Sequence, residues 1–386
     1  MTSRSISPVQ LAVVLFGLCF AFGFWLAKHK PVWNDEIFTQ LSTVEKPSYV
    51  EILKLDFEEG NACPLFYLLQ KAITDTAGYR FPQQWQGEWS IKDLRSQMVL
   101  RIGPNLFSAL TIALIFYFFA RSYSLAAGGY ALLITLSSFM IWAYWVEARP
   151  YSIWTFLTTA QCLLFLVLLK GKGENRRAWQ WLLLTHVLLS FTVVISIVQV
   201  FLVSLALWLF KERRWQRYVG LTLLPAAVSV FYYFHSPQYH FVFSNTISQL
   251  IGASLPKDRM LILVLYPLFL GWYYWRDKGK VSVSDGFWRE GTSFLFLSAL
   301  MVLSAIAVLL KLKMSVVEGR PGFQVSNRYL IYLTPVGIIG VTLFSIHILR
   351  AFQKNKWAKL ILILVFAGLL LLRAMRTYGQ LQGIYS

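Results

Sequence analysis

The chain has 386 residues, of which 57% are hydrophobic and only 14% are charged. Soluble domains contain about 25% charged residues, so this composition excludes a soluble globular protein and indicates a polytopic membrane protein. The formal net charge is +18, but lysine and arginine collect in cytoplasmic loops and face anionic lipid, so we do not expect nucleic-acid binding. The apolar runs are continuous rather than alternating, which favours helices over barrel strands. We therefore expect an all-α fold with one integral-membrane domain over residues 1–386.

The first apolar run covers roughly residues 10–27 and follows Arg4 in the manner of a signal peptide. It ends in Phe-Trp-Leu-Ala-Lys, without a small-residue cleavage pattern, and we interpret it as an uncleaved first helix. A long polar stretch follows over roughly residues 28–97 and holds most of the acidic residues. Its segments 49–57 and 65–73 have apolar residues at helical spacing, which predicts amphipathic helices in the membrane interface.

Hydropathy predicts about eleven spans in all. After the first helix they cover roughly residues 99–120, 125–145, 151–169, two short spans within 179–210 with a break at 196–199, 218–234, 260–275, 292–312, 329–349, and a last helix ending near Leu372. A cytoplasmic N-terminus places the basic loops near residues 121, 170–177, 211–217, 276–289 and 350–359 all inside. The loops 28–97, 147–151, 235–258 and 313–328 then lie outside.

Asp35 and Glu36 are adjacent carboxylates just beyond the first helix, next to Trp33, which suits an interfacial anchor. Neighbouring side chains point in different directions, so we expect at most one of the two to face a given substrate. Solvated loop carboxylates are an ordinary alternative. If the pair belongs to an active site, one of its carboxylates can serve as the general base, with Asp35 as the first choice and Glu36 as the second.

Arg149 lies between Glu147 and Pro150-Tyr151, at the predicted start of a helix on the outer face. An anion there would meet the guanidinium together with the free N–H groups of the helix N-terminus. The alternative is an arginine that only extends to the lipid interface.

Arg320 and Arg328 flank the late external segment, and Arg328-Tyr329 opens the next predicted helix. The orientation rule does not call for arginine on this face, so a phosphate clamp competes with a fixed salt bridge or an interfacial role. Lys257 and Arg259 would add to the same positive field. His235 and His240 have no metal-ligand spacing, and we do not expect them to bind a metal by themselves. No Gly-rich nucleotide loop occurs.

Four motifs together resemble the GT-C fold glycosyltransferases, in particular the bacterial relatives of protein O-mannosyltransferases and lipid A aminoarabinose transferases. They are Asp35-Glu36, Pro64 to Leu69, Glu147 to Tyr151, and Arg328 to Pro335. The resemblance implies a bacterial inner-membrane enzyme whose site lies outside. It also implies a polyprenyl-phosphate sugar as donor and an acidic residue of the first external loop as base, here Asp35. In the family, His-Pro-Pro commonly precedes the Leu-Tyr stretch, whereas this chain has Ala62-Cys63-Pro64, which puts a divalent metal ion in doubt.

The expected function is therefore inverting transfer of a sugar to an acceptor hydroxyl, with the acceptor being a lipid, a glycan or a protein. Because a lipid phosphate is already a good leaving group, cations are needed more than an acid. The residues expected to bind the substrate or its phosphate are Arg149, Tyr151, Arg320, Arg328, Tyr329, Glu147, Lys257 and Arg259. Two alternatives remain: a transporter or flippase of lipid-linked saccharides, and a polymerase or ligase of lipid-linked glycans.

Overall fold

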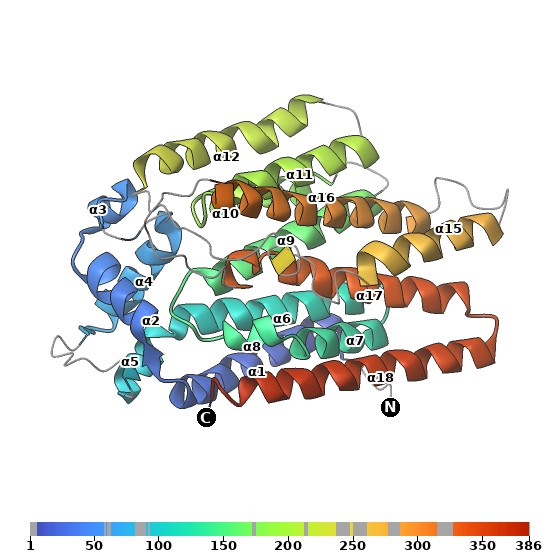
Figure 1. Ribbon diagram of the computed structural model, residues 1–386, viewed down its shortest axis with the longest axis horizontal. Helices are drawn as coiled ribbons and strands as arrows, with labels where there is room; N and C mark the ends of the chain where they lie inside the picture. Colours follow the sequence, from blue (N-terminus) through green and yellow to red (C-terminus); the bar gives the residue numbers. More distant parts are fainter. Residues whose placement is uncertain are drawn as a thin grey trace.

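The computed structural model describes residues 6–57, 59, 63–81, 90–91, 93–171, 175–211, 215–236, 248–249, 261–276, 286–314 and 327–385. In these ranges the protein is a bundle of helices that run side by side (Figure 1). A two-residue antiparallel pairing joins β1 (Val32–Trp33) to β2 (Ser90–Ile91). The expectation of an all-α membrane protein is confirmed at this level, because seven of the described helices are long and apolar enough to cross a membrane.

The seven helices with these properties are α1 (Pro8–His29), α6 (Ile102–Ser122), α9 (Tyr151–Lys170), α12 (Trp215–His235), α16 (Gly286–Met314, its span being Gly286–Leu309), α17 (Leu333–Ala351) and α18 (Lys356–Leu381). The shorter helices of the bundle are α7 (Leu125–Leu136), α8 (Phe139–Ala143), α10 (Arg176–Ser190), α11 (Ser196–Phe210) and α15 (Tyr266–Arg276), the last preceded by the π-helix η2 (Leu261–Leu265). The total of about eleven spans stays a prediction.

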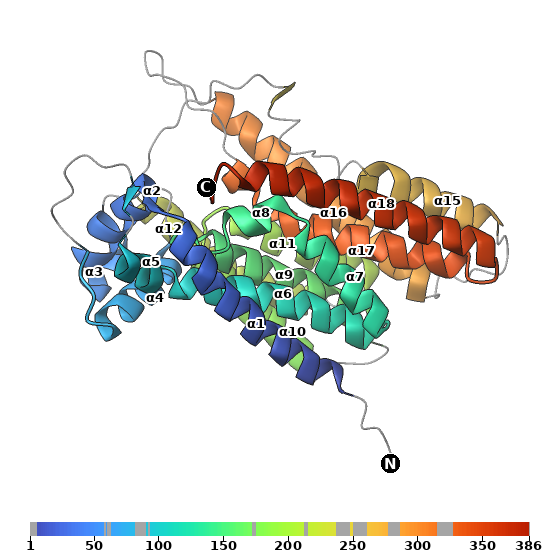
Figure 2. The same cartoon turned by 90° about the horizontal axis from the view of Figure 1, so that it is seen from below.

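Helix α9 is the centre of the bundle, packed against α6, α10, α11, α16 and α17. Its residues are mostly buried, and Phe165, Leu166 and Cys162 are completely so. Helix α18 instead lies at the edge of the bundle, against α7, α8 and α17, with most of its apolar residues exposed (Figure 2). Exposed leucines on such a helix match a lipid-facing surface rather than a protein core.

The elements between α1 and α6 gather at one end of the bundle (Figure 1). They are α2 (Asn34–Phe38), the π-helix η1 (Thr39–Glu45), α3 (Tyr49–Lys54), α4 (Pro64–Thr76) and α5 (Leu94–Leu100). Helices α3 and α4 correspond to the two amphipathic segments, so that prediction of helix is confirmed. Ser48 caps α3, Pro64 is the first residue of α4, and Asp93 caps α5, as expected of these residue types.

Several predicted boundaries differ from the structure. The predicted span 125–145 is two helices, because the chain leaves the helix after Leu136 and α8 begins at Phe139. The break predicted at 196–199 lies earlier, between α10 and α11, and Ser196 already opens α11. Helix α18 continues past Leu372 to Leu381. By contrast, α9 begins at Tyr151 directly after Pro150, as predicted.

Candidate functional site

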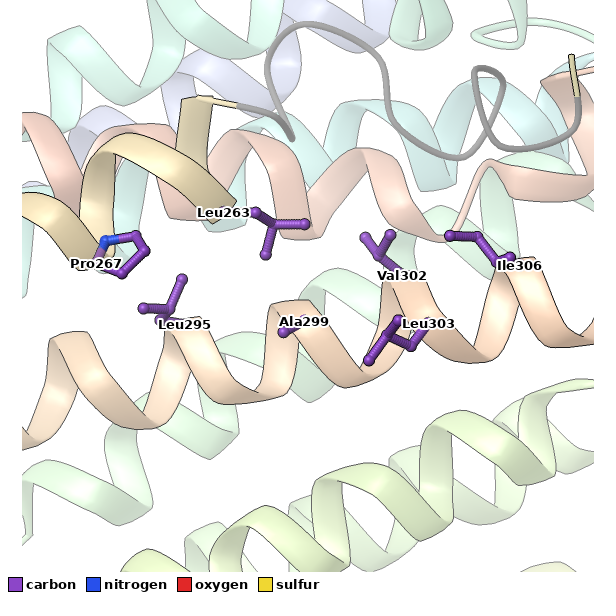
Figure 3. A pocket seen from close by; sticks show the side chains of 7 residues that line it. All are labelled: Leu263, Pro267, Leu295, Ala299, Val302, Leu303 and Ile306. Carbon is purple, nitrogen blue, oxygen red and sulfur yellow. The ribbon is translucent and has the colours of Figure 1, made fainter. Parts of the chain in front are cut away.

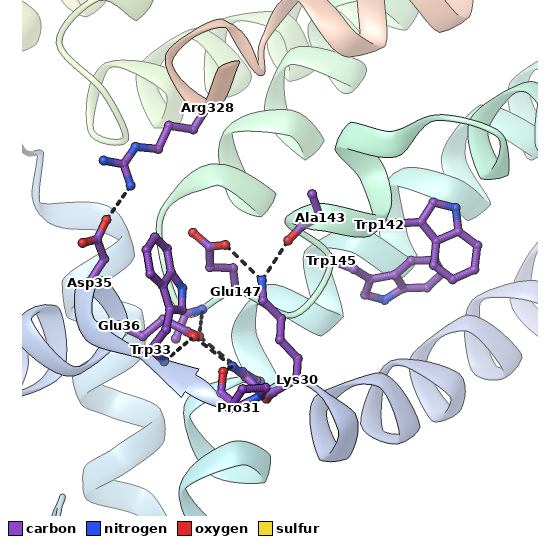
Figure 4. A network of polar contacts seen from close by, with 12 residues as sticks. Lys30, Pro31, Trp33, Asp35, Glu36, Trp142, Ala143, Trp145, Glu147 and Arg328 are labelled. Carbon is purple, nitrogen blue, oxygen red and sulfur yellow. Dashed lines mark hydrogen bonds and ion pairs between the residues drawn. The ribbon is translucent and has the colours of Figure 1, made fainter. Parts of the chain in front are cut away.

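Asp35 and Arg328 form an ion pair that joins the segment after α1 to the segment before α17 (Figure 4). Asp35 lies in the first turn of α2, and Arg328 lies in the short 3-10 helix η3 (Asn327–Leu330). The two side chains are 27% and 24% exposed, respectively. Burial lowers the pKa of Arg328, but Tyr151, Tyr329 and Asp35 outweigh it and leave this pKa raised. Arg328 is therefore charged, and the partial exposure of both side chains leaves them within reach of a bound molecule.

Arg149 lies beside this pair. Its Nη1 donates to the Thr39 hydroxyl, lies 2.6 Å from Glu59 Oε1 and lies 3.4 Å from the backbone oxygen of Asp35. Burial lowers the pKa of Arg149, but Glu59, Tyr151, Tyr67 and Asp35 together outweigh burial and hold this pKa well above its ordinary value. Arg149 Nε is buried and has no hydrogen-bond partner among the described residues. A buried donor of this kind would gain from a ligand acceptor.

Glu59 is held by two hydroxyls of η1, because its Oε2 accepts from Thr39 at 3.0 Å and from Thr43 at 3.2 Å. Tyr67 of α4 adjoins it, and burial followed by the Glu59 charge raises the pKa of Tyr67 well above its ordinary value. Glu59 was not among the predicted site residues. It supplies the counter-charge that lets Arg149 remain buried.

Glu36 differs from Asp35 completely in its surroundings. Its carboxylate is fully buried and accepts from Arg101 Nε at 3.2 Å, Arg101 Nη2 at 2.8 Å and the Ala148 N–H at 2.7 Å. Burial alone would raise the pKa of Glu36, but the charge and hydrogen bonds of Arg101, with Lys30, lower it below 4.5. The structure thus gives Glu36 a structural role and leaves Asp35 as the only accessible carboxylate of the pair.

Arg101 organises the turn beneath the site. It is fully buried, and beyond Glu36 it donates to the backbone oxygens of Ala27, Lys30 and Pro31. Arg101 thereby fixes the chain between α1 and α2, directly before Asp35. The sequence held a usable signal for it: by the predicted topology Arg101 lies at the outer end of a span, where the orientation rule does not call for arginine.

Glu147 was expected to help bind phosphate, but it faces the protein interior. It forms a 3.0 Å ion pair with Lys30, and both side chains are buried (Figure 4). Burial raises the pKa of Glu147 above its ordinary value. The Lys30–Glu147 pair therefore supports the loop before α9 and is not placed to touch a ligand.

The two predicted tyrosines stay near the arginines. Arg149 Cζ lies 6.0 Å from the ring centre of Tyr151, and Arg328 Cζ lies 5.4 Å from the ring centre of Tyr329. Tyr151 is buried, whereas Tyr329 is 37% exposed. Such contacts orient a guanidinium without using its N–H donors.

The remaining predicted residues are not observed at this site. Arg320, Lys257, Arg259 and His240 lie outside the described residues. His235 ends α12, and its ring stacks on Phe231 with centroids 4.0 Å apart. Over the described ranges, no group of three or more His, Cys, Asp or Glu side chains is arranged to hold a metal ion.

An apolar groove lies between η2–α15 and α16 (Figure 3). It encloses about 400 Å³ and is lined only by apolar side chains, among them Leu263, Pro267, Leu295 and Leu303. Leu303 is 60% exposed, so the groove is open to the surroundings of the bundle. Its lining is therefore suited to apolar contacts rather than to hydrogen bonds.

Comparison of the chain with protein-family models and with curated proteins finds no match.

Proposed function

We propose that this protein is an integral-membrane glycosyltransferase that moves a sugar from a polyprenyl-phosphate donor to an acceptor hydroxyl at the outer membrane face, with inversion. One observation carries the proposal: the accessible carboxylate of Asp35 lies against Arg328 and next to a second arginine, the mostly buried Arg149. The residue motifs that resemble the GT-C glycosyltransferases lend it further support. The bacterial inner membrane and an outward-facing site are part of the same proposal.

The reaction assigns one job to each side chain. The acceptor oxygen attacks the anomeric carbon while the bond from that carbon to the phosphate oxygen breaks. The phosphate leaves with the electron pair, and Arg149 and Arg328 stabilise the negative charge that grows on it. Asp35 takes the proton from the acceptor hydroxyl. A single displacement without a covalent sugar–enzyme intermediate inverts the anomeric centre.

The ion pair also suggests an order of events. While Arg328 holds Asp35, a carboxylate oxygen that would accept the proton is occupied. A donor phosphate offers Arg328 a bidentate partner, so binding of the donor would free Asp35 at the moment when a base is needed. The prenyl chain would lie between helices, and the groove between η2–α15 and α16 is a suitable path.

A flippase of lipid-linked saccharides is the second candidate, favoured by the interruption between α7 and α8. The two are separated in proteoliposomes with a panel of polyprenyl-phosphate sugars and an acceptor panel of lipids, glycans and peptides. Release of polyprenyl phosphate supports the transferase. If the intact lipid-linked sugar moves across the bilayer and no donor in the panel releases polyprenyl phosphate, the protein is a flippase and the transferase proposal is wrong. Growth of a glycan on its own lipid carrier would instead identify a polymerase.

A further inference from the structure

The segment 137–149 carries Arg149 into the site, although most of it is buried and much of it is not helical. It begins where α7 ends and includes the short helix α8. Carbonyl groups that leave a helix inside an apolar bundle have no water to bind, so each needs a donor from elsewhere in the protein. Several carbonyl groups of this segment accept hydrogen bonds from distant parts of the chain.

Two of these donors lie on α18. Arg373 Nε donates to the carbonyl oxygen of Ser137 at 3.1 Å, and the Thr377 hydroxyl donates to the same oxygen at 2.8 Å. Residues 373 and 377 are one helical turn apart, so both face the interruption between α7 and α8. Helix α18 thus satisfies the carbonyl group that the end of α7 leaves free.

The third donor follows α18. The Tyr385 hydroxyl donates to the carbonyl oxygen of Trp142 at 2.7 Å. Burial raises the pKa of Tyr385 above its ordinary value of 10, so its hydroxyl stays protonated and able to donate. The next carbonyl, that of Ala143, accepts from Lys30 Nζ at 2.9 Å (Figure 4). Tyr385 and Lys30 therefore fix adjacent peptide groups a few residues before Glu147 and Arg149.

The far end of the segment is tied to α2 itself. Ser108 of α6 donates to the Trp145 carbonyl at 2.9 Å, and the Ala148 N–H donates to Glu36 at 2.7 Å. Glu36 directly follows Asp35, so the backbone next to Arg149 is bonded to the residue beside the expected base. A displacement of the backbone at Trp142 would therefore change the distance between Arg149 and Asp35.

We propose that Arg373, Thr377 and Tyr385 are positioning residues, which hold the segment 137–149 so that Arg149 stands beside Asp35. Helix α18 is then more than a lipid-facing helix, because its Arg373 and Thr377 side chains help to set the geometry of a site on other elements. The effect of these residues on catalysis rests on the proposed function, whereas their effect on the conformation of the segment 137–149 is independent of it.

The test compares matched variants by amide hydrogen exchange and by donor kinetics. Tyr385→Phe and Thr377→Val each remove one hydroxyl with little change of shape, and Thr377→Ser restores it. Tyr378→Phe is the control on the same helix, since Tyr378 is 68% exposed. We expect faster exchange in peptides covering residues 138–150 for Tyr385→Phe and Thr377→Val. In these two variants, peptides from α3 and α10 should exchange as in the wild type. In Thr377→Ser and Tyr378→Phe, all peptides should exchange as in the wild type.

The kinetic arm uses the donor that the wild type cleaves best. The loss of one hydrogen bond predicts about a threefold to tenfold lower kcat with little change in donor KM. Exchange in residues 138–150 that matches the wild type, or that rises equally throughout the protein, would overturn the positioning role. A wild type that cleaves no donor refutes the proposed function instead, and the exchange data still decide whether α18 positions the segment.

Discussion

Asp35 and Arg328 are 293 residues apart in the chain, yet their side chains form an ion pair. One belongs to the first turn after β1 and the other to the turn before α17. The pair therefore joins the segment that offers a base to the segment that offers a cation. Its partial exposure distinguishes it from the neighbouring Glu36–Arg101 pair, which is fully buried.

If Arg328 binds the donor phosphate, its loss weakens both donor binding and leaving-group stabilisation. We expect Arg328→Gln to lower kcat/KM by about tenfold to a hundredfold, the usual range for one charge-assisted hydrogen bond. The kcat/KM of Arg328→Lys should lie between those of Arg328→Gln and the wild type. Arg80→Gln is the matched control, because the Arg80 side chain is 65% exposed and its ion pair is with Asp75. Equal kcat/KM for Arg328→Gln and Arg80→Gln would remove Arg328 from the site.

Glu36→Gln should destabilise the protein far more than substitution of an exposed carboxylate. It leaves the Arg101 charge buried without its counter-ion, which costs about 3–5 kcal/mol in comparable sites. The measurement is thermal unfolding in detergent micelles, with Asp56→Asn at an exposed position as control. Adding Arg101→Met to Glu36→Gln should recover part of the loss, because the uncompensated charge is then gone. A melting temperature of Glu36→Gln equal to that of the control would contradict this role.

The same pair predicts an acid dependence of stability. The pKa of Glu36 is lowered in the folded protein from its ordinary value of 4.5. The unfolded chain therefore binds the proton first, and the stabilisation from Glu36 is complete above about pH 4.5 and is lost as the pH falls through the lower, folded pKa. The difference in melting temperature between wild type and Glu36→Gln should narrow below pH 4.5. A difference that is constant down to pH 3 would speak against the ion pair.

The predicted topology can be tested with introduced cysteines, because Cys19, Cys63 and Cys162 are all buried. Native thiols should thus give a silent background to an impermeant reagent. Lys54 in α3 and Lys354 before α18 are both exposed, and the two segments lie at opposite ends of the bundle (Figure 1). In intact cells Lys54→Cys should be labelled and Lys354→Cys should be labelled only after permeabilisation. The reverse pattern would invert the orientation.

The sequence predicted those helices whose formation depends on neighbouring residues in the chain. The apolar spacing of residues 49–57 and 65–73 predicted α3 and α4, and Pro150 marked the start of α9. The interruption between α7 and α8 was not predicted, because Ser137-Ser138 scarcely lowers the hydropathy of an otherwise apolar run. What stabilises that interruption comes from α18, far along the chain.

The same distinction applies to the site. Charges on the predicted outer face identified Asp35, Arg149 and Arg328, and the structure brings these three together. Sequence position could not distinguish Asp35 from Glu36, because only the fold decides which of the two meets Arg101. Glu59 was one carboxylate among many in an acidic loop, and its pairing with Arg149 is a tertiary contact.

The most direct test of the account is the rate of sugar transfer by Asp35→Asn, in liposomes, from a polyprenyl-phosphate sugar that the wild type uses. Asparagine keeps the size of the side chain but cannot accept the proton, so we expect a rate about 10²–10⁴-fold lower. Donor binding, measured by retention of radiolabelled donor on the purified protein, should be unchanged. Transfer at the wild-type rate would contradict the assignment of Asp35 as the base and, with it, the proposed mechanism.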